Sequence, residues 1–406
     1  MNEIKFVDYS QSKYKEIGTF FQGLAKVKNR QNLYGFINKE GKEVITPAYL
    51  DTREFSEGLS AVQDPDSFLW GFINKKGELV IPYQYRDAGC FSEGYASVQL
   101  TNGNWIFINK DGLRDFSGEY AEVHSEFSEG YALVRLNGKS EKTFIDKRGI
   151  IKGSYKNATH FSNGLAVVED DKNYYIINQN FYPISTKNKS EFSKIEGNTE
   201  LLFLTKNFNC YGFLTEQFEE IIPIDFEKAE KFSDGMAKVK LSSNWEGYVT
   251  RKGKIMAFSN NYQYEELNNF HQGLARVKSA ATYLYGYINK KGEETIKCEY
   301  EDAMEFNEGL AGVVDTDGVF HYIDKYGKKI ITLPQMYFST LELDDKIIIL
   351  SAESKEELAV KKLQVLSSIK SEIIQKVTDV IDQLAYDETS SIPESHYTRV
   401  RKPNIE

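Results

Sequence analysis

The sequence predicts an all-β repeat array of about nine to ten three-stranded antiparallel units, followed by a C-terminal amphipathic α-helix. Three observations lead to this prediction. A phrase of the form F-x-x-G-L-A-x-V returns at a nearly constant interval, each copy is followed by short segments of alternating apolar residues, and the C-terminal part changes to apolar steps of three or four. A fixed period near 36 residues is typical of repeat architectures, whose units bury apolar surface against their neighbours.

The glycine of the recurring phrase defines the period. Its copies are Gly23, Gly58, Gly94, Gly130, Gly164, Gly235, Gly273 and Gly309. All steps are 34 to 38 residues except one of 71, which holds two units, the second with the altered phrase FSKIEGN. We expect a tenth, degraded unit in FSTLELDDKIIIL at 338–350.

Each unit is predicted to hold three strands. The first follows the glycine, as in Leu24–Val27, and the second is represented by Tyr34–Asn38; both alternate with period two, which is typical of strands. An Asn or Asp with a glycine three residues later then gives the chemistry of a hairpin turn. The third strand stops at a proline such as Pro47, which cannot donate to a ladder.

The domain boundaries follow from these elements. We predict a lead-in strand in residues 1–15, the repeat array in 16–350, a helix in 351–386 and a flexible tail in 387–406. We favour an open, twisted arc, because propeller blades usually carry four strands in 40 or more residues. A closed propeller-like ring is the alternative.

The centre of the array, near 180–205, is predicted to be weak. Its turn INQNFYP lacks the usual glycine, and a polar run STKNKSEFSK follows. A weak pair of units would let the two halves of an array move independently. Ordinary drift of one unit is the alternative to a hinge.

Pairs of an aromatic residue and a glycine mark the second predicted strand. They are Tyr34-Gly35, Trp70-Gly71, Tyr211-Gly212 and Tyr285-Gly286. Within F-x-x-G-L-A-x-V and W/Y-G-F-I-N-K-x-G-x-x-V-I-P, these residues resemble the WG-containing repeats of bacterial proteins, over about four fifths of the chain. The resemblance implies an all-β repeat protein that acts as a binding or scaffold module, and it brings no catalytic residues. Copies depart from it at Trp105-Ile106, Thr143-Phe144, Tyr174-Tyr175 and Phe320-His321.

We assign the tryptophans and aromatic-glycine pairs to packing between repeats rather than to a carbohydrate platform. The predicted repeat-packing residues are Tyr34, Gly35, Trp70, Gly71, Trp105, Tyr211, Gly212, Trp245, Tyr285 and Gly286.

Composition and motifs limit the function classes. A net charge of -10 argues against a broad electrostatic hold on nucleic acid or anionic lipid. No secretory signal or membrane span is visible, so we expect a cytoplasmic protein. Its three cysteines form no metal or redox motif, and its five histidines lie at different phases of the repeat, so we predict no metal and no cofactor. No catalytic motif occurs, and we predict that the protein is not an enzyme.

An acidic residue precedes the repeat glycine in five copies, as in Glu57 and Glu308, but Gln22 and Asn163 show that an amide is also accepted there. A row of carboxylates could bind cations or a basic partner. We favour the alternative, that a short polar acceptor satisfies backbone N–H groups of the turn, because amides can do this too.

The C-terminal helix begins at a predicted capping box, Ser354 to Glu357. We favour a role as a cap over the end of the array, which solenoids need. Alternatively, its apolar stripe pairs with another chain or with a second copy. The residues of this stripe are Leu363, Leu366, Ile369, Ile373, Val377 and Val380.

Together these features favour a non-enzymatic protein-binding scaffold, whose partner is another protein that the sequence does not identify. A partner-neutralising protein, such as an immunity or regulatory factor, is one alternative. An enzyme with an unrecognised pocket between repeats is the other.

Overall fold

The computed structural model describes residues 6–241, 245–257, 263–343, 346–352 and 357–368, with the single positions 355, 371 and 375. The chain divides into two compact units. One is Ser12–Leu333, and the other combines Met1–Gln11 with Pro334–Glu406.

The larger unit consists of antiparallel β-sheets. Its described strands form seven four-stranded sheets and one seven-stranded sheet. Within the latter, only the pair Trp105 and Tyr120 joins the third strand of one repeat to the first strand of the next. We therefore treat it as two sheets and number the repeat sheets 1 to 9 along the chain, sheet 3 having three strands and every other sheet four.

The strands of equal rank in the nine sheets have the following bounds. First strands are β2 (Glu16–Phe21), β6 (Asp51–Thr52), β10 (Asp87–Ala88), β13 (Tyr120–Ser128), β17 (Asn157–Ala158), β21 (Lys194–Thr199), β25 (Lys228–Ala229), β29 (Tyr264–His271) and β33 (Asp302–Ala303). Second strands are β3 (Leu24–Lys28), β7 (Leu59–Gln63), β11 (Tyr95–Gln99), β14 (Tyr131–Leu136), β18 (Leu165–Glu169), β22 (Leu202–Asn207), β26 (Met236–Leu241), β30 (Leu274–Ser279) and β34 (Ala311–Val314).

Third strands are β4 (Tyr34–Asn38), β8 (Trp70–Asn74), β12 (Trp105–Asn109), β15 (Lys142–Asp146), β19 (Asn173–Asn178), β23 (Cys210–Leu214), β27 (Trp245–Thr250), β31 (Tyr285–Asn289) and β35 (Phe320–Ile323). Fourth strands are β5 (Glu43–Tyr49), β9 (Leu79–Tyr85), β16 (Ile151–Tyr155), β20 (Pro183–Asn188), β24 (Glu220–Phe226), β28 (Ile255–Ala257), β32 (Glu294–Tyr300) and β36 (Lys329–Thr332).

The prediction of three strands per unit is therefore wrong, since nearly every described sheet has four. The predicted strands are the second, third and fourth of each sheet. The missing one precedes the recurring phrase and is often only two residues long, as in Asp51–Thr52, which pairs with Val62 and Gln63. A strand this short carries no alternating pattern for the sequence to show.

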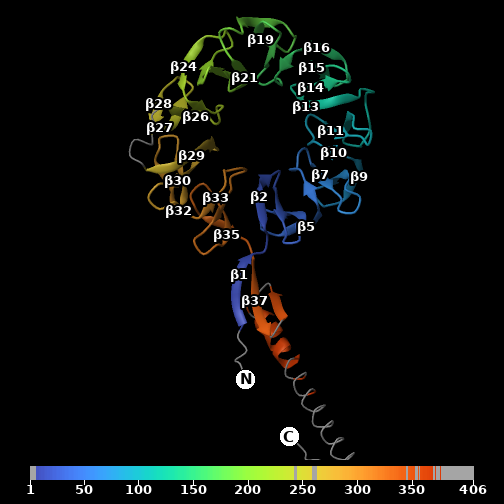
Figure 1. Cartoon of the computed structure of the whole chain (residues 1–406), viewed down its shortest axis with the longest axis vertical. Helices are drawn as coiled ribbons and strands as arrows, with labels where there is room; N and C mark the ends of the chain where they lie inside the picture. The colour runs from blue at the N-terminus through green and yellow to red at the C-terminus, as the bar shows by residue number, and fades with distance from the viewer. Residues whose placement is uncertain are drawn as a thin grey trace, which may run out of the picture. The chain divides into compact units, whose positions relative to one another are not determined.

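The sheets of the larger unit follow one another around a ring, with the first strand of each nearer the centre and the fourth toward the outside (Figure 1). The ring is closed, because sheet 9 packs on sheet 1. The Phe20 and Tyr322 rings lie 4.6 Å apart, and the Tyr322 hydroxyl donates to the carbonyl of Gly18. The favoured open arc is thus corrected to the closed alternative. Closure depends on a small rotation summed over all interfaces, which one repeat does not reveal.

The core lies between consecutive sheets rather than at one centre. Between sheets 1 and 2, for example, Leu24, Phe36 and Ile45 pack against Phe55 and Ile73. The Phe36 and Phe55 rings meet edge to face, with centroids 4.8 Å apart. Burial of such side chains is the main stabilising term of a repeat interface, so each sheet depends on both neighbours.

The centre of the array is packed by aromatic rings. Phe181 and Phe218 stand where other turns have glycine, at φ of 64° and 60°. The Phe181 ring lies 5.1 Å from that of Tyr131 in sheet 4 and 5.5 Å from that of Phe161, which lies between the first and second strands of sheet 5. Where the turn glycine is replaced by Phe181, the ring of this residue packs against the preceding sheet.

The smaller unit contains a three-stranded sheet in the order β1 (Phe6–Ser12), β37 (Gln335–Leu343) and β38 (Lys346–Ala352). The expected tenth repeat at 338–350 is therefore wrong, because this segment lies in the β37–β38 hairpin with no four-stranded sheet of its own.

The predicted helix does not begin at residue 351, since β38 extends to Ala352. Residues 357–368 are helical, and most positions after them, including the tail 387–406, lie outside the described residues. Among the described residues, no helix has the length and apolar character needed to cross a membrane.

Candidate functional site

The recurring phrase forms a two-residue hairpin turn between the first and second strands of a sheet. Glu57 and Gly58 have φ of 50° and 89°, and Ser56 and Leu59 exchange backbone hydrogen bonds across them. Two consecutive residues with positive φ define a type I′ turn, which matches the twist of the flanking strands. Glycine is favoured at the second position because its backbone is left-handed there, although Leu201 takes this place in sheet 6 with a φ of 64°.

In eight of the turns, the polar residue binds the next turn. Glu57 accepts a hydrogen bond of 3.1 Å from the backbone N–H of Gly94, which belongs to the following sheet. The same contact is made by Gln22 to Gly58, Glu93 to Gly130, Glu129 to Gly164, Glu200 to Gly235, Asp234 to Gly273, Gln272 to Gly309 and Glu308 to Gly23. The acidic row is therefore a set of backbone acceptors, as favoured from the sequence, although the donor lies in the neighbouring turn.

The last of these contacts joins the two ends of the array. Glu308 in sheet 9 accepts from Gly23 in sheet 1 and pairs with Lys39 at 3.1 Å. Burial opposes the charge of Glu308, but Lys39 and the Gly23 N–H outweigh it, so the pKa of this carboxyl lies below its ordinary value. The ring-closing interface thus uses the same contacts as the internal ones.

The aromatic-glycine pairs mark a close approach of two strands. A Cβ on Gly71 would lie 2.6 Å from the carbonyl oxygen of Ile81 and 2.9 Å from Cδ1 of Tyr83. Strand pairing is irregular here, since Trp70 pairs with Tyr85 while Phe72 pairs with Ile81. The fourth strand bulges toward the glycine, at Pro82 in this sheet and at Lys297 in the sheet of Gly286, so the close approach requires the glycine and the bulge accommodates a proline.

The other predicted pairs have the same geometry. Gly35, Gly212 and Gly286 are buried, and a Cβ on each would meet backbone atoms of the fourth strand within 2.8 Å. In the copies without this glycine, such as the one with Tyr175, the pairing at that position is regular.

The predicted packing aromatics are not buried equally. Trp70 is buried, whereas Tyr34, Trp105, Tyr211 and Tyr285 are half-buried. The side chain of Trp245 lies outside the described residues.

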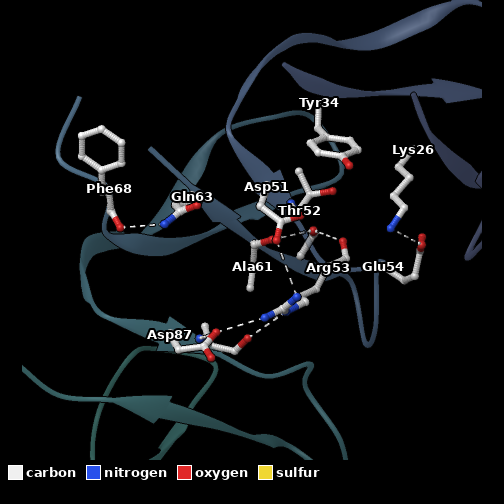
Figure 2. Close-up of polar contacts among 12 residues, drawn as sticks. Lys26, Tyr34, Asp51, Thr52, Arg53, Glu54, Ala61, Gln63, Phe68 and Asp87 are labelled. Carbon is white, nitrogen blue, oxygen red and sulfur yellow. Dashed lines mark hydrogen bonds and ion pairs between the residues drawn. The ribbon is translucent and has the colours of Figure 1, made fainter. Parts of the chain in front are cut away.

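Several of these aromatics have a cation over the ring, which the sequence did not indicate. The fullest example is Arg53 of sheet 2, whose guanidinium carbon lies 4.6 Å from the centre of the Trp70 ring. It also donates to the Asp87 carboxylate of sheet 3 at 3.0 Å (Figure 2). A second hydrogen bond, of 3.2 Å, goes to the carbonyl of Ala88 in the same sheet. Arg53 therefore links two sheets through stacking, charge and a hydrogen bond.

The described histidines and cysteines form no cluster. His321 is buried, and its ring nitrogens lie 2.7 Å from Asp315 and 2.9 Å from Thr332. Burial lowers the pKa of His160. Cys90, Cys210 and Cys298 are free thiols. Within the described part of the chain, no group of three or more His, Cys, Asp or Glu side chains is placed to hold a metal ion.

The loops between second and third strands expose aromatic side chains that the sequence analysis did not single out. Phe68, Phe208 and Tyr283 are 64%, 86% and 62% exposed, and their φ values are 60°, 50° and 60°. Asn32 and Gly103 take the corresponding place in other sheets, also with positive φ. A bulky aromatic is strained in this conformation, and strain of this kind clusters at binding sites.

These loops share one end of the sheets. Because neighbouring strands run in opposite directions, the turns after first and third strands lie at one end of each sheet, and the loops after second strands lie at the other. We call these the turn end and the loop end. The loop end, with Phe68, Phe208 and Tyr283, is the candidate interaction surface.

The predicted partner helix is described only in part. Leu363 is 67% exposed and Leu366 is half-buried. Ile369, Ile373, Val377 and Val380 lie outside the described residues.

Comparisons with known proteins agree with this architecture. The family described as WG containing repeat matches six segments, residues 34–64, 70–105, 107–139, 144–174, 211–245 and 285–318. No curated protein sequence matches the chain.

Among solved structures, a eukaryotic initiation factor is similar at a TM-score of 0.50 and 9% identity, over 82% of this chain and 98% of that one. BamB from Moraxella catarrhalis gives a TM-score of 0.36 at 9% identity, over 78% and 97%. The WD40 β-propeller domain of Doa1 gives 0.29 at 10% identity, over 60% and 95%. The first of these supports the fold alone.

Proposed function

Because the chain belongs to the family of WG-containing repeat proteins, we propose that it is a non-enzymatic scaffold that binds another protein at its loop end. The observation that carries this proposal is the exposure of Phe68, Phe208 and Tyr283 in left-handed backbone. Tyrosine and phenylalanine are enriched at the buried core of protein–protein interfaces relative to the rest of the surface. Their strain has no compensating burial within the chain.

The turn end supports the same choice by contrast. Its polar side chains are engaged within the ring, as Glu57 is by Gly94 and by Lys110 at 3.0 Å. The repeated acids therefore serve the fold in every copy rather than one asymmetric reaction site, which favours a scaffold over an enzyme. We also propose a cytoplasmic location, which is supported by three unpaired cysteines.

The proposal is tested by replacing the three loop aromatics with asparagine, which tolerates positive φ. The matched control replaces three exposed apolar residues at the turn end, Leu113, Tyr182 and Tyr326, with asparagine. Both variants and the unchanged protein are used to capture proteins from a lysate of the native source, and captured proteins are quantified by mass spectrometry. Direct binding is then measured with the purified candidate.

We expect a partner to be retained by the turn-end variant and lost by the loop-end variant. The loop-end variant should be as stable as the unchanged protein or more so, since it relieves strain of about 1 kcal/mol per residue. Equal capture by both variants would contradict the assignment of the binding surface.

A further inference from the structure

Several sheets place a cation over an aromatic residue at the first or second position of their third strand. The cation-to-ring distances are 4.7 Å for Lys28 and Tyr34, 4.6 Å for Arg53 and Trp70, 5.3 Å for Lys189 and Tyr174, 5.0 Å for Lys206 and Tyr211, and 5.2 Å for Arg276 and Tyr285. A cation over this ring is therefore a recurring feature of the sheets, and Arg53 and Arg276 also donate to a carbonyl of the following sheet, that of Ala88 and that of Ala303.

Between sheets 2 and 3 this site is complete for a guanidinium group. Trp70 supplies the ring beneath Arg53, and the carbonyl of Ala88 accepts a hydrogen bond from it. Asp51 and Asp87 lie 3.7 Å and 3.0 Å from the guanidinium nitrogens of Arg53 (Figure 2). A flat ring and two carboxylates suit the planar, delocalised guanidinium better than a compact ammonium.

The interface that closes the ring has the same frame without the arginine. Counting from the turn glycines Gly58, Gly94, Gly309 and Gly23, the residues Asp302, Glu16 and Ile17 stand at the positions of Asp51, Asp87 and Ala88, and Met304 stands at that of Arg53. The loop before the third strand is one residue shorter in sheet 9, and Phe320, which pairs with Val314, takes the place of Trp70, which pairs with Gln63. The aromatic ring of Phe320 and the two acids are thus present, while the thioether of Met304 takes the place of the arginine.

A pocket of about 310 Å³ lies at this interface. It is lined by Ser12, Tyr14, Lys15, Glu16, Ile17, Asp302, Met304, Val314, Gly318 and Phe320. Val314 and Gly318 take the places of Gln63 and Phe68 at the complete site, so two large side chains are replaced by smaller ones. The sulfur of Met304 lies close to Gly312.

The charges around the pocket are mixed but compatible with a cation. Glu16 is held ionised, because its hydrogen bonds with Lys28 and Tyr34 and the nearby charge of Lys15 keep its pKa below the ordinary value. Lys15 lines the pocket, and its Nζ donates to Asn32 at 2.7 Å. The complete site also has a basic residue at the place of Lys15, namely Arg86, so this charge does not exclude a guanidinium.

We propose that the pocket between sheets 9 and 1 binds a guanidinium group from outside the chain, stacked on Phe320 between Asp302 and Glu16. The group is either a free alkylguanidine or the end of an arginine side chain in another polypeptide. This site is independent of the loop-end aromatics and of the proposed scaffold role.

The test is a titration with N-methylguanidinium, followed by saturation-transfer NMR and by calorimetry, with methylammonium as a control of equal charge. We expect saturable one-to-one binding with a dissociation constant on the order of millimolar, as suits five heavy atoms, and at least about tenfold weaker binding of methylammonium. The peptide Ac-Gly-Arg-Gly-NH₂ is titrated in parallel. Binding of both ligands supports an arginine side chain as the source, and binding of N-methylguanidinium alone supports a small molecule.

Three variants make the site assignment falsifiable. Met304→Arg should fill the pocket with the chain's own guanidinium and abolish binding. Asp302→Asn keeps an oxygen for the Ala303 N–H, which Asp302 now accepts at 2.8 Å, but removes a charge and should weaken binding at least about fivefold. Arg53→Met should create a second site, so that the stoichiometry rises to two.

No saturable binding to the unchanged protein would overturn the proposal. So would unchanged binding in Met304→Arg, provided that circular dichroism shows this variant to be folded. If it does not fold, unchanged binding in Asp302→Asn together with a stoichiometry of one in Arg53→Met has the same consequence.

Discussion

Replacing Gly71 with valine should destabilise the protein far more than replacing the nearby Lys76 with alanine. The first added carbon on Gly71 would lie 2.6 Å from the carbonyl oxygen of Ile81, where ordinary contact begins at 3.4 Å. One of the two strands must move by about 0.8 Å, and the obstacle is backbone rather than the end of a flexible side chain. Lys76 is exposed, and its side chain stands in solvent at the turn.

We expect a loss of about 1–3 kcal/mol for Gly71→Val, with Gly71→Ala at the lower end of this range. Lys76→Ala should change the stability by no more than about 0.5 kcal/mol. Denaturant unfolding, followed by tryptophan fluorescence and by circular dichroism, measures both. A unit of this size need not unfold in two states, so midpoints are compared first and free energies only where the two probes coincide.

Equal midpoints for Gly71→Val and Lys76→Ala would refute the argument that strand approach requires the glycine. A matched comparison is Gly58→Ala, where a Cβ meets nothing within 4 Å but φ is 89°. Its cost should be about 1 kcal/mol and should arise from backbone strain alone. Gly58→Asn should recover most of that cost, whereas Gly71→Asn should not.

Three further outcomes are expected. Glu308→Ala should lower the free energy of unfolding by about 1–2 kcal/mol, because it removes the acceptor for the Gly23 N–H at the ring closure. An unchanged unfolding midpoint would argue against that contact. Burial raises the pKa of Glu126 to about 7, against hydrogen bonds from Ser97, so the folded state binds the proton more tightly than the unfolded state. Stability should therefore fall by about 1–3 kcal/mol as pH rises from about 4.5 to about 7, and Glu126→Gln should lack this fall. Finally, limited proteolysis distinguishes a hinge in the centre from ordinary sequence drift of one repeat. A hinge predicts that the first cuts fall between about residues 185 and 198. Phe192 and Ile195 are buried against residues of sheet 5, so we expect drift and no early cut in this segment.

The repeat, its glycines and three of its four strands were predictable because each copy repeats the residues that make the same contacts. The aromatic-glycine pair of Trp70 and Gly71 recurs in the sequence, and the structure gives the reason for the glycine, namely the bulge that brings the fourth strand against it. The identity of Glu57 as a backbone acceptor was also predictable. Its donor was not, because Gly58 and Gly94 are equivalent in a periodic sequence, and only the packing of sheets selects the second.

What the sequence left open depends on differences between copies or on the whole array. The short first strands, such as Asp87–Ala88, have too few residues for a pattern. The sequence does carry a signal for the loop conformation of Phe68, because Asn and Gly at the equivalent positions 32 and 103 indicate a positive φ. This signal is visible only after the copies are aligned on the loop between second and third strands. The pocket near Met304 requires the further knowledge that sheet 9 meets sheet 1.

The two ends of the sheets therefore serve different purposes. At the turn end, the recurring polar residues contact the neighbouring sheet. At the ring closure, Glu308 pairs with Lys39 as Glu57 pairs with Lys110 between internal sheets. These polar residues, unlike the exposed apolar residues of the same end, cannot change without a cost to two sheets at once. At the loop end, Asn32, Phe68 and Gly103 occupy the same backbone conformation without such a partner, so side chains can differ between copies while the ring stays intact. A ring built in this way separates stability from recognition, which is the property that a binding scaffold needs.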